Sequence, residues 1–89
     1  MLMIATRNVT TDRVTLVLEG GVIGPWVDEL RLACNRALGT HGALTLDLGG
    51  VGFIDRAGLA LFRELGDRSV RVTNCSPFVA EQLREIAAW

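Results

Sequence analysis

The sequence predicts a small α/β domain with a four-stranded mixed sheet and helices on one face, in the order β-β-α-β-α-β-α. Two observations lead to this prediction. Apolar residues alternate with polar ones along four short segments, which is typical of strands with one buried face. Segments with helical spacing separate the later strands, which favours parallel pairing between them.

The first two strands are expected at residues 2–6 and 14–19, where every second residue is apolar. The stretch N-V-T-T-D-R between them is rich in turn formers, so we expect an antiparallel hairpin. Two more strands are expected at 44–48 and 70–73. The positions opposite the leucines and valines are mostly polar, which places every helix on the other face. This polar set comprises Thr15, Glu19, Thr45, Asp47, Arg71 and Thr73.

Three amphipathic helices are expected between and after these strands. Pro25 suits the first turn of the first helix and Gly39 its C-terminal cap, which gives about fourteen residues. Its apolar stripe leaves out Leu32, which projects about 200 degrees away from Leu30. The stripe contains Trp26, Val27, Leu30, Ala33, Cys34, Ala37 and Leu38.

The second helix is expected from Asp55 to about Leu65, closed by Gly66, and the third opens at Ser76-Pro77. Asp55 is interpreted mainly as the cap of its helix, with its carboxylate accepting from the N–H of Ala57 or Gly58. A catalytic role for it needs a partner, and the nearby sequence offers only Arg56.

Composition limits the function classes. The 89 residues form one domain (1–89), with nine arginines, no lysine and a net charge of −1. The charges are spread without runs, so we expect no nucleic-acid partner. No apolar stretch reaches the roughly 20 residues of a membrane span, and the start lacks a signal-peptide layout, so we expect a cytoplasmic protein without membrane insertion.

The glycines of G-G-V-G-F-I-D-R-A-G-L, residues 49–59, invite comparison with phosphate-binding loops. A P-loop requires a lysine, which this chain lacks. A dinucleotide fingerprint requires a third glycine at a fixed place after Gly50 and Gly52, which is absent, and Phe53 and Ile54 fill the loop with bulk. The single histidine, His41, cannot build a histidine metal cluster. We therefore expect no enzyme activity, cofactor or metal.

The two cysteines match no metal-ligand spacing and are expected to be reduced. Cys34 falls on the apolar stripe of the first helix and is interpreted as a small buried hydrophobe. Cys75 precedes the last helix, where a helix N-terminus can lower a thiol's pKa. A structural role for Cys75 and a reactive one both remain open, with the structural role favoured because no general base is visible.

The second helix begins A-G-L-A-L-F and is apolar all round, unlike an ordinary surface helix. Two interpretations stand side by side. Leu59, with Ala57 and Ala60 beside it, forms an exposed apolar spot that binds a partner. Alternatively, the preceding loop folds over and buries it.

The run L-T-L-D-L-G-G-V-G-F-I-D-R-A-G-L-A-L-F resembles the central signature of STAS domains, the anti-sigma-factor antagonist family. The run V-R-V-T-N-C-S-P-F-V-A-E-Q-L resembles the family's final strand, Ser-Pro turn and last helix, so the resemblance covers nearly the whole chain. It implies a small sheet with helices along one side. It also implies protein binding: antagonists capture an anti-sigma factor that is also a kinase, and phosphorylation of a serine at the helix start releases them.

The phosphorylation switch does not carry over, because Ala57 stands where that serine would be and Arg56 precedes it. No Ser or Thr occurs from Leu46 through Arg68. The family's Gly-x-x-Asp motif after the second strand is also missing, and the second helix with its exit is about two turns shorter than the family leads us to expect. We therefore expect binding that phosphorylation at Ala57 does not control.

The expected partner-binding residues lie on the second helix, and the partner is an anti-sigma factor or kinase-like protein. They are Asp55, Arg56, Ala57, Gly58, Leu59, Ala60 and Phe62. One alternative is a small STAS subunit bound to the ATPase of an ABC-type lipid transport system. Another is an anion- or nucleotide-sensing domain at the start of the second helix. A homodimer through Leu32 or the Leu59 region is possible.

Overall fold

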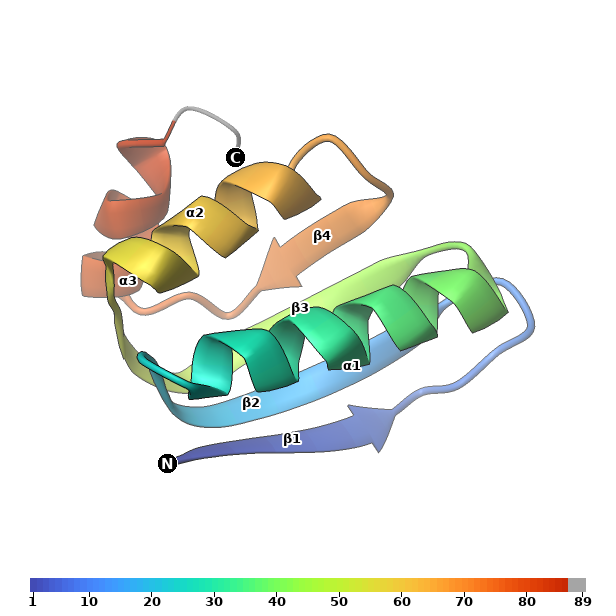
Figure 1. The fold of residues 1–89 in the computed structure, drawn as a ribbon. Helices are drawn as coiled ribbons and strands as arrows, with labels where there is room; N and C mark the ends of the chain where they lie inside the picture. Colours follow the sequence, from blue (N-terminus) through green and yellow to red (C-terminus); the bar gives the residue numbers. More distant parts are fainter. Residues whose placement is uncertain (87–89) are drawn as a thin grey trace.

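The computed structural model describes residues 1–86. Within that range the elements follow the expected order β-β-α-β-α-β-α (Figure 1). The strands are β1 Leu2–Arg7, β2 Val14–Val22, β3 Leu44–Ile54 and β4 Val70–Thr73. The helices are α1 Trp26–His41, α2 Arg56–Leu65 and α3 Pro77–Arg84. None of these helices is long and apolar enough to cross a membrane.

The strands form one mixed sheet in the order β1-β2-β3-β4. The hairpin of β1 and β2 is antiparallel, with Ile4 opposite Leu18. The other two pairings, β2 with β3 and β3 with β4, are parallel, because α1 and α2 carry the chain back between them. The predicted mixed sheet is confirmed.

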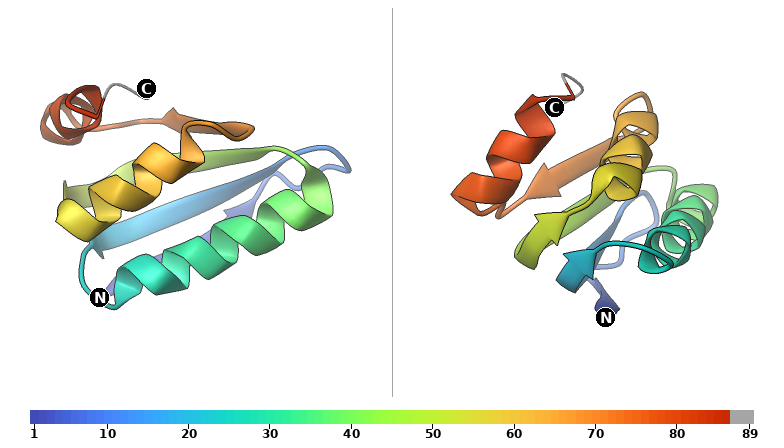
Figure 2. Two further views of the ribbon diagram at one scale, coloured as in Figure 1. Left: turned by 45° about the horizontal axis from the view of Figure 1, so that its top comes forward. Right: turned by 60° about the vertical axis from the view of Figure 1, so that its left-hand side comes forward.

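A single hydrophobic core lies between the sheet and the helices. Figures 1 and 2 show α1 and α2 over the same face of the sheet, with α3 beside β4 at the edge of the sheet. The alternate apolar residues of β2 and β3 and the expected stripe of α1 meet in this core, while Leu32 is 61% exposed as its angle predicts. The third helix adds Val79 and Leu83. Its cap is the predicted one, since Ser76 Oγ accepts from the Val79 N–H at 3.2 Å.

On the opposite face of the sheet, two polar side chains are buried and hydrogen-bonded rather than exposed to solvent. Thr45 and Asp47 in β3 belong to the expected polar set, yet both are buried. The guanidinium of Arg7 donates to Asp47 at 2.6 Å, and that of Arg13 donates to Thr45 Oγ1 at 3.2 Å. The pKa of Asp47 lies below its usual range, because its carboxylate accepts from the Gly49 N–H and from Asn74 and pairs with Arg7.

Two predicted boundaries are wrong. The first helix does not end at Gly39 but continues to His41, and Gly42 closes it with φ 84 and an N–H bonded to Leu38 O at 2.9 Å. This C-terminal cap uses the left-handed conformation, which Gly42 adopts, three residues beyond the predicted cap Gly39.

The segment 49–54, expected as a loop after a strand ending at Leu48, is the second half of β3. It stays paired with β2 across two register shifts, with Gly50 opposite Glu19. A Cβ on Gly50 would stand 2.9 Å from Glu19 Cγ and 3.0 Å from Leu18 O. Gly50 therefore allows β2 and β3 to approach closely, and this steric role explains a glycine that a phosphate-loop interpretation would assign to ligand binding.

The second half of β3 runs past the end of β4, so within residues 1–86 its outer edge has no strand beside it. The side chain of Gln82 in α3 takes over part of that role. Its Oε1 accepts from the Ile54 N–H at 3.1 Å, and its Nε2 donates to the Ile54 carbonyl at 2.7 Å. One amide thus imitates the pairing of a strand and fixes α3 against β3.

We expect Gln82→Ala to lower the free energy of unfolding by about 1–3 kcal/mol, because it removes both bonds to Ile54. Urea denaturation measures the loss. The neighbouring exposed change Glu81→Ala serves as the control and should stay within about 0.5 kcal/mol of the wild type. Equal stability of all three proteins would show that the Gln82 amide does not hold α3.

Candidate functional site

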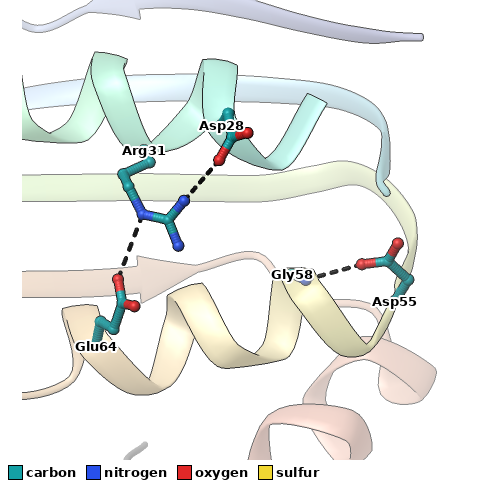
Figure 3. A network of polar contacts seen from close by, with 5 residues as sticks. All are labelled: Asp28, Arg31, Asp55, Gly58 and Glu64. Carbon is teal, nitrogen blue, oxygen red and sulfur yellow. Dashed lines mark hydrogen bonds and ion pairs between the residues drawn. The ribbon is translucent and has the colours of Figure 1, made fainter. Parts of the chain in front are cut away.

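Asp55 stands between β3 and α2 and is the N-cap of that helix, as predicted. Its backbone is extended (φ −83, ψ −178), and its Oδ1 accepts from the Gly58 N–H at 2.8 Å (Figure 3). Its carbonyl accepts the first helical bond, from the Leu59 N–H at 2.8 Å. The cap fixes where the helix begins and in which direction its first turn faces.

The second carboxylate oxygen makes a contact that the sequence analysis missed. Oδ2 of Asp55 accepts from the Gly24 N–H at 2.8 Å, and the Asp55 N–H donates to the Val22 carbonyl at 3.1 Å. Gly24 adopts a left-handed conformation, with φ 55, which the I-G-P sequence could have suggested. One side chain thus joins the β2–α1 connection to the start of α2.

These N–H groups set the charge of the site. The pKa of Asp55 lies below its usual range, because its carboxylate accepts from the N–H of Gly24 and of Gly58, which together outweigh its partial desolvation. The group is therefore ionised at neutral pH and is unsuited to act as a general acid. Its negative charge occupies the N-terminus of α2, where an anionic ligand would otherwise bind.

Gly58 is needed for the close approach of α2 to the sheet. A Cβ at this position would stand 2.6 Å from the Val22 carbonyl oxygen and 2.7 Å from Ile54 Cγ2. Both distances are shorter than real Cβ contacts, so even alanine would push the helix away. The glycine of the D-R-A-G motif therefore has a steric role.

The seven expected partner-binding residues differ in exposure. Arg56, Ala57 and Ala60 are exposed, Asp55 is half-buried, and Leu59 is half-buried against the core. Gly58 and Phe62 are buried, and Phe62 has no exposed surface at all. The inclusion of these two as contact residues is corrected: they hold α2 in place from below. Leu59 is neither fully exposed for a partner nor fully buried, so it lies between the two interpretations of the apolar helix start.

A second link sets the orientation of α2 from its other end. Arg31 in α1 donates from Nη1 to Asp28 Oδ1 at 2.7 Å, and its Nε lies 3.5 Å from Glu64 Oε2 in α2 (Figure 3). The Glu64 carboxylate is more than half exposed, so this pair contributes little to stability. It connects α1 with α2 near the end of α2 that lies away from Asp55.

Three exposed apolar side chains lie on the segments around the start of α2, in the β2–α1 connection, at the end of β3 and in α3. We call these three, Ile23, Phe53 and Phe78, the apolar rim. Their exposed fractions are 38%, 48% and 56%. The rings of Phe53 and Phe78 stack with centroids 6.1 Å apart. Ile23 precedes Gly24, which donates to Asp55, and Phe53 precedes Ile54, which donates to Gln82. No local sequence pattern predicts the rim, because the exposure of these side chains depends on how distant segments pack.

The cysteines offer no reactive site. Burial raises the pKa of Cys34 to about 12. Burial also raises the pKa of Cys75, against the lowering that a helix N-terminus would give, so the structural role is the better interpretation for both. In the described part of the chain, residues 1–86, no group of His, Cys, Asp or Glu is arranged to hold a metal ion.

Comparison with known proteins identifies the fold. No family model and no curated protein matches the sequence. Among solved structures, the anti-sigma factor antagonist SpoIIAA in its unphosphorylated form superposes with a TM-score of 0.71. The match covers 92% of this chain and 82% of that chain at 19% sequence identity. The chain therefore has the STAS fold that its sequence resemblance implies.

We expect Asp55→Ala to cost about 2 kcal/mol of unfolding free energy at pH 7, since it removes the cap and the bond to Gly24. A carboxylate whose pKa is lowered by folding stabilises the protein above its unfolded pKa of about 3.9, and this stabilisation is lost as the pH falls through the folded value.

The difference between wild type and Asp55→Ala should therefore be constant from pH 7 to about pH 5 and shrink below about pH 4. Chemical denaturation at a series of pH values measures it. Asp47 titrates in both proteins and cancels in the difference. A difference that stays the same down to pH 2 would contradict the role of the ionised carboxylate.

Proposed function

We propose that this protein is a non-enzymatic protein-interaction domain of bacterial signalling that resembles an anti-sigma factor antagonist. It binds its partner through the start of α2 and does not depend on phosphorylation at Ala57. The observation that carries the proposal is the Asp55 clamp, by which we mean its bonds to Gly24 and Gly58. The clamp holds a surface that is exposed, weakly polar and without a catalytic group.

The chemistry of this surface supports protein binding. Arg56, Ala57 and Ala60 present one positive charge and small apolar groups. The apolar rim adds exposed side chains on the β2–α1 connection, at the end of β3 and on α3. Aromatic residues and arginine are typical of the residues that dominate protein interfaces. A complementary partner surface would carry an acidic group facing Arg56 and apolar side chains facing the rim.

Phosphate control has no acceptor here. Ala57 is exposed at the place of the family's serine, but it has no hydroxyl. The nearest hydroxyls along the sequence are Thr45, buried in β3 on the opposite face of the sheet, and Ser69, beyond the other end of α2. A phosphate on either would not add its charge at the start of α2.

The alternatives differ in how well the geometry supports them. Anion sensing at the start of α2 is disfavoured, because the Asp55 carboxylate already accepts from the N–H groups that an anion would need. A subunit bound to a transport ATPase would use the same kind of protein-binding surface. The identity of the partner therefore distinguishes a role in transport from a role in sigma-factor regulation.

Affinity capture from cell extract with Ala57→Glu tests the proposal. Glutamate in the first turn suits the helix, so the fold is kept while bulk and negative charge enter the surface. We expect wild type to recover a protein with a kinase-type ATP-binding domain, and the variant to recover at least about tenfold less, as for loss of a central contact.

Ala5→Glu, the same change on the uncovered face of the sheet, is the matched control and should capture as well as wild type. Mass spectrometry identifies the partner, and recovery of a transporter ATPase would select the transport alternative. If Ala57→Glu captures every protein as well as wild type does, the start of α2 is not the binding surface.

A further inference from the structure

The face of α1 that looks toward β1 is left uncovered within the described chain. α1 lies over β2 and β3, and β1 forms the edge of the sheet, so a groove of about 490 Å³ runs between α1 and β1. Its lining includes the apolar residues Ile4, Leu16 and Ala37. Figure 1 places β1 on one side of α1 and α2 on the other, so this groove is separate from the Asp55 clamp.

The helical wall of this groove carries one large apolar side chain between two opposite charges. Leu32 is 61% exposed at the rim. Glu29 and Arg36 line the same wall, both are exposed, and neither makes an ion pair within residues 1–86. We call Glu29, Leu32, Ala33 and Arg36 the α1 flank.

The order of residues along the α1 flank makes it complementary to itself. Glu29 lies three residues before Leu32, and Arg36 lies three residues after Ala33. A two-fold axis between Leu32 and Ala33 would therefore set Glu29 of each copy against Arg36 of the other. The same axis sets the large Leu32 against the small Ala33, so that size as well as charge is matched.

We propose that the α1 flank binds the α1 flank of a second copy of this chain, with the two helices antiparallel. A parallel arrangement would set Glu29 against Glu29 and Arg36 against Arg36, which repel. The antiparallel one forms two ion pairs about 10.5 Å apart, the length of seven helical residues, and covers Leu32. The start of α2 remains free to bind its own partner in this dimer.

The dimer is weak, because one helix pair buries less than the roughly 1,200 Å² of a standard stable interface. Sedimentation velocity of the full chain from about 10 μM to about 1 mM covers the range in which such an interface associates. We expect a concentration-dependent shift from monomer to dimer in the wild type.

Charge reversal tests the register directly. Glu29→Arg alone leaves two positive charges facing each other in each pair, and Arg36→Glu alone leaves two negative ones. Each variant should therefore dimerise at least about tenfold more weakly than wild type. In an equimolar mixture, the heterodimer regains attraction in both of the pairs that each homodimer loses. The weakening by each single reversal is what identifies the antiparallel pairing, because a parallel pairing is already repulsive in the wild type. The double variant Glu29→Arg/Arg36→Glu should self-associate as wild type does.

Two further variants complete the design. Leu32→Glu should abolish association alone and in the double variant, while circular dichroism shows that the exposed change leaves the monomer folded. Arg63→Glu on α2 reverses an exposed charge outside the α1 flank and should leave association unchanged. A wild type that stays monomeric at 1 mM would overturn the proposal, as would single charge reversals that dimerise like wild type.

Discussion

The carboxylate of Asp55 is the interaction on which the arrangement of the candidate site depends. One oxygen caps α2 through Gly58, and the other holds the β2–α1 connection through Gly24. Asp55 and Gly24 are 31 residues apart in sequence, and this one side chain bonds to both segments. The exposed positions 56, 57 and 60 gain a fixed place relative to the sheet because a single charged group holds both sides.

The same arrangement explains why the glycine-rich stretch is structural. Gly50 lets β3 approach β2, and Gly58 lets α2 approach Val22, so each of these two glycines is required by a neighbour that leaves no room for a Cβ. The N-terminus of α2, where a phosphate loop would bind its ligand, is filled by Asp55. What the stretch offers to the outside is a rigid helix start with Arg56 and Ala57, which suits a constitutive protein contact better than a switch.

Local patterns in the sequence predict much of this structure. The alternation of the strands, the caps Asp55 and Ser76 and the exposure of Leu32 depend on residues within one or two turns, and all are confirmed. The contacts that were missed join residues far apart: Gln82 with Ile54 over 28 positions and Arg7 with Asp47 over 40. No periodicity records such pairs, which is also why β3 was expected to end too early.

Amide hydrogen exchange at Gly24 and Gly58 tests the central claim most directly. If the Asp55 carboxylate holds both segments, these two N–H groups exchange slowly in the wild type and both exchange faster in Asp55→Ala, while the amides of the core strand β3 stay protected. Unchanged exchange at Gly24 in the variant would contradict the account, because Asp55 would then cap α2 without stabilising the β2–α1 connection.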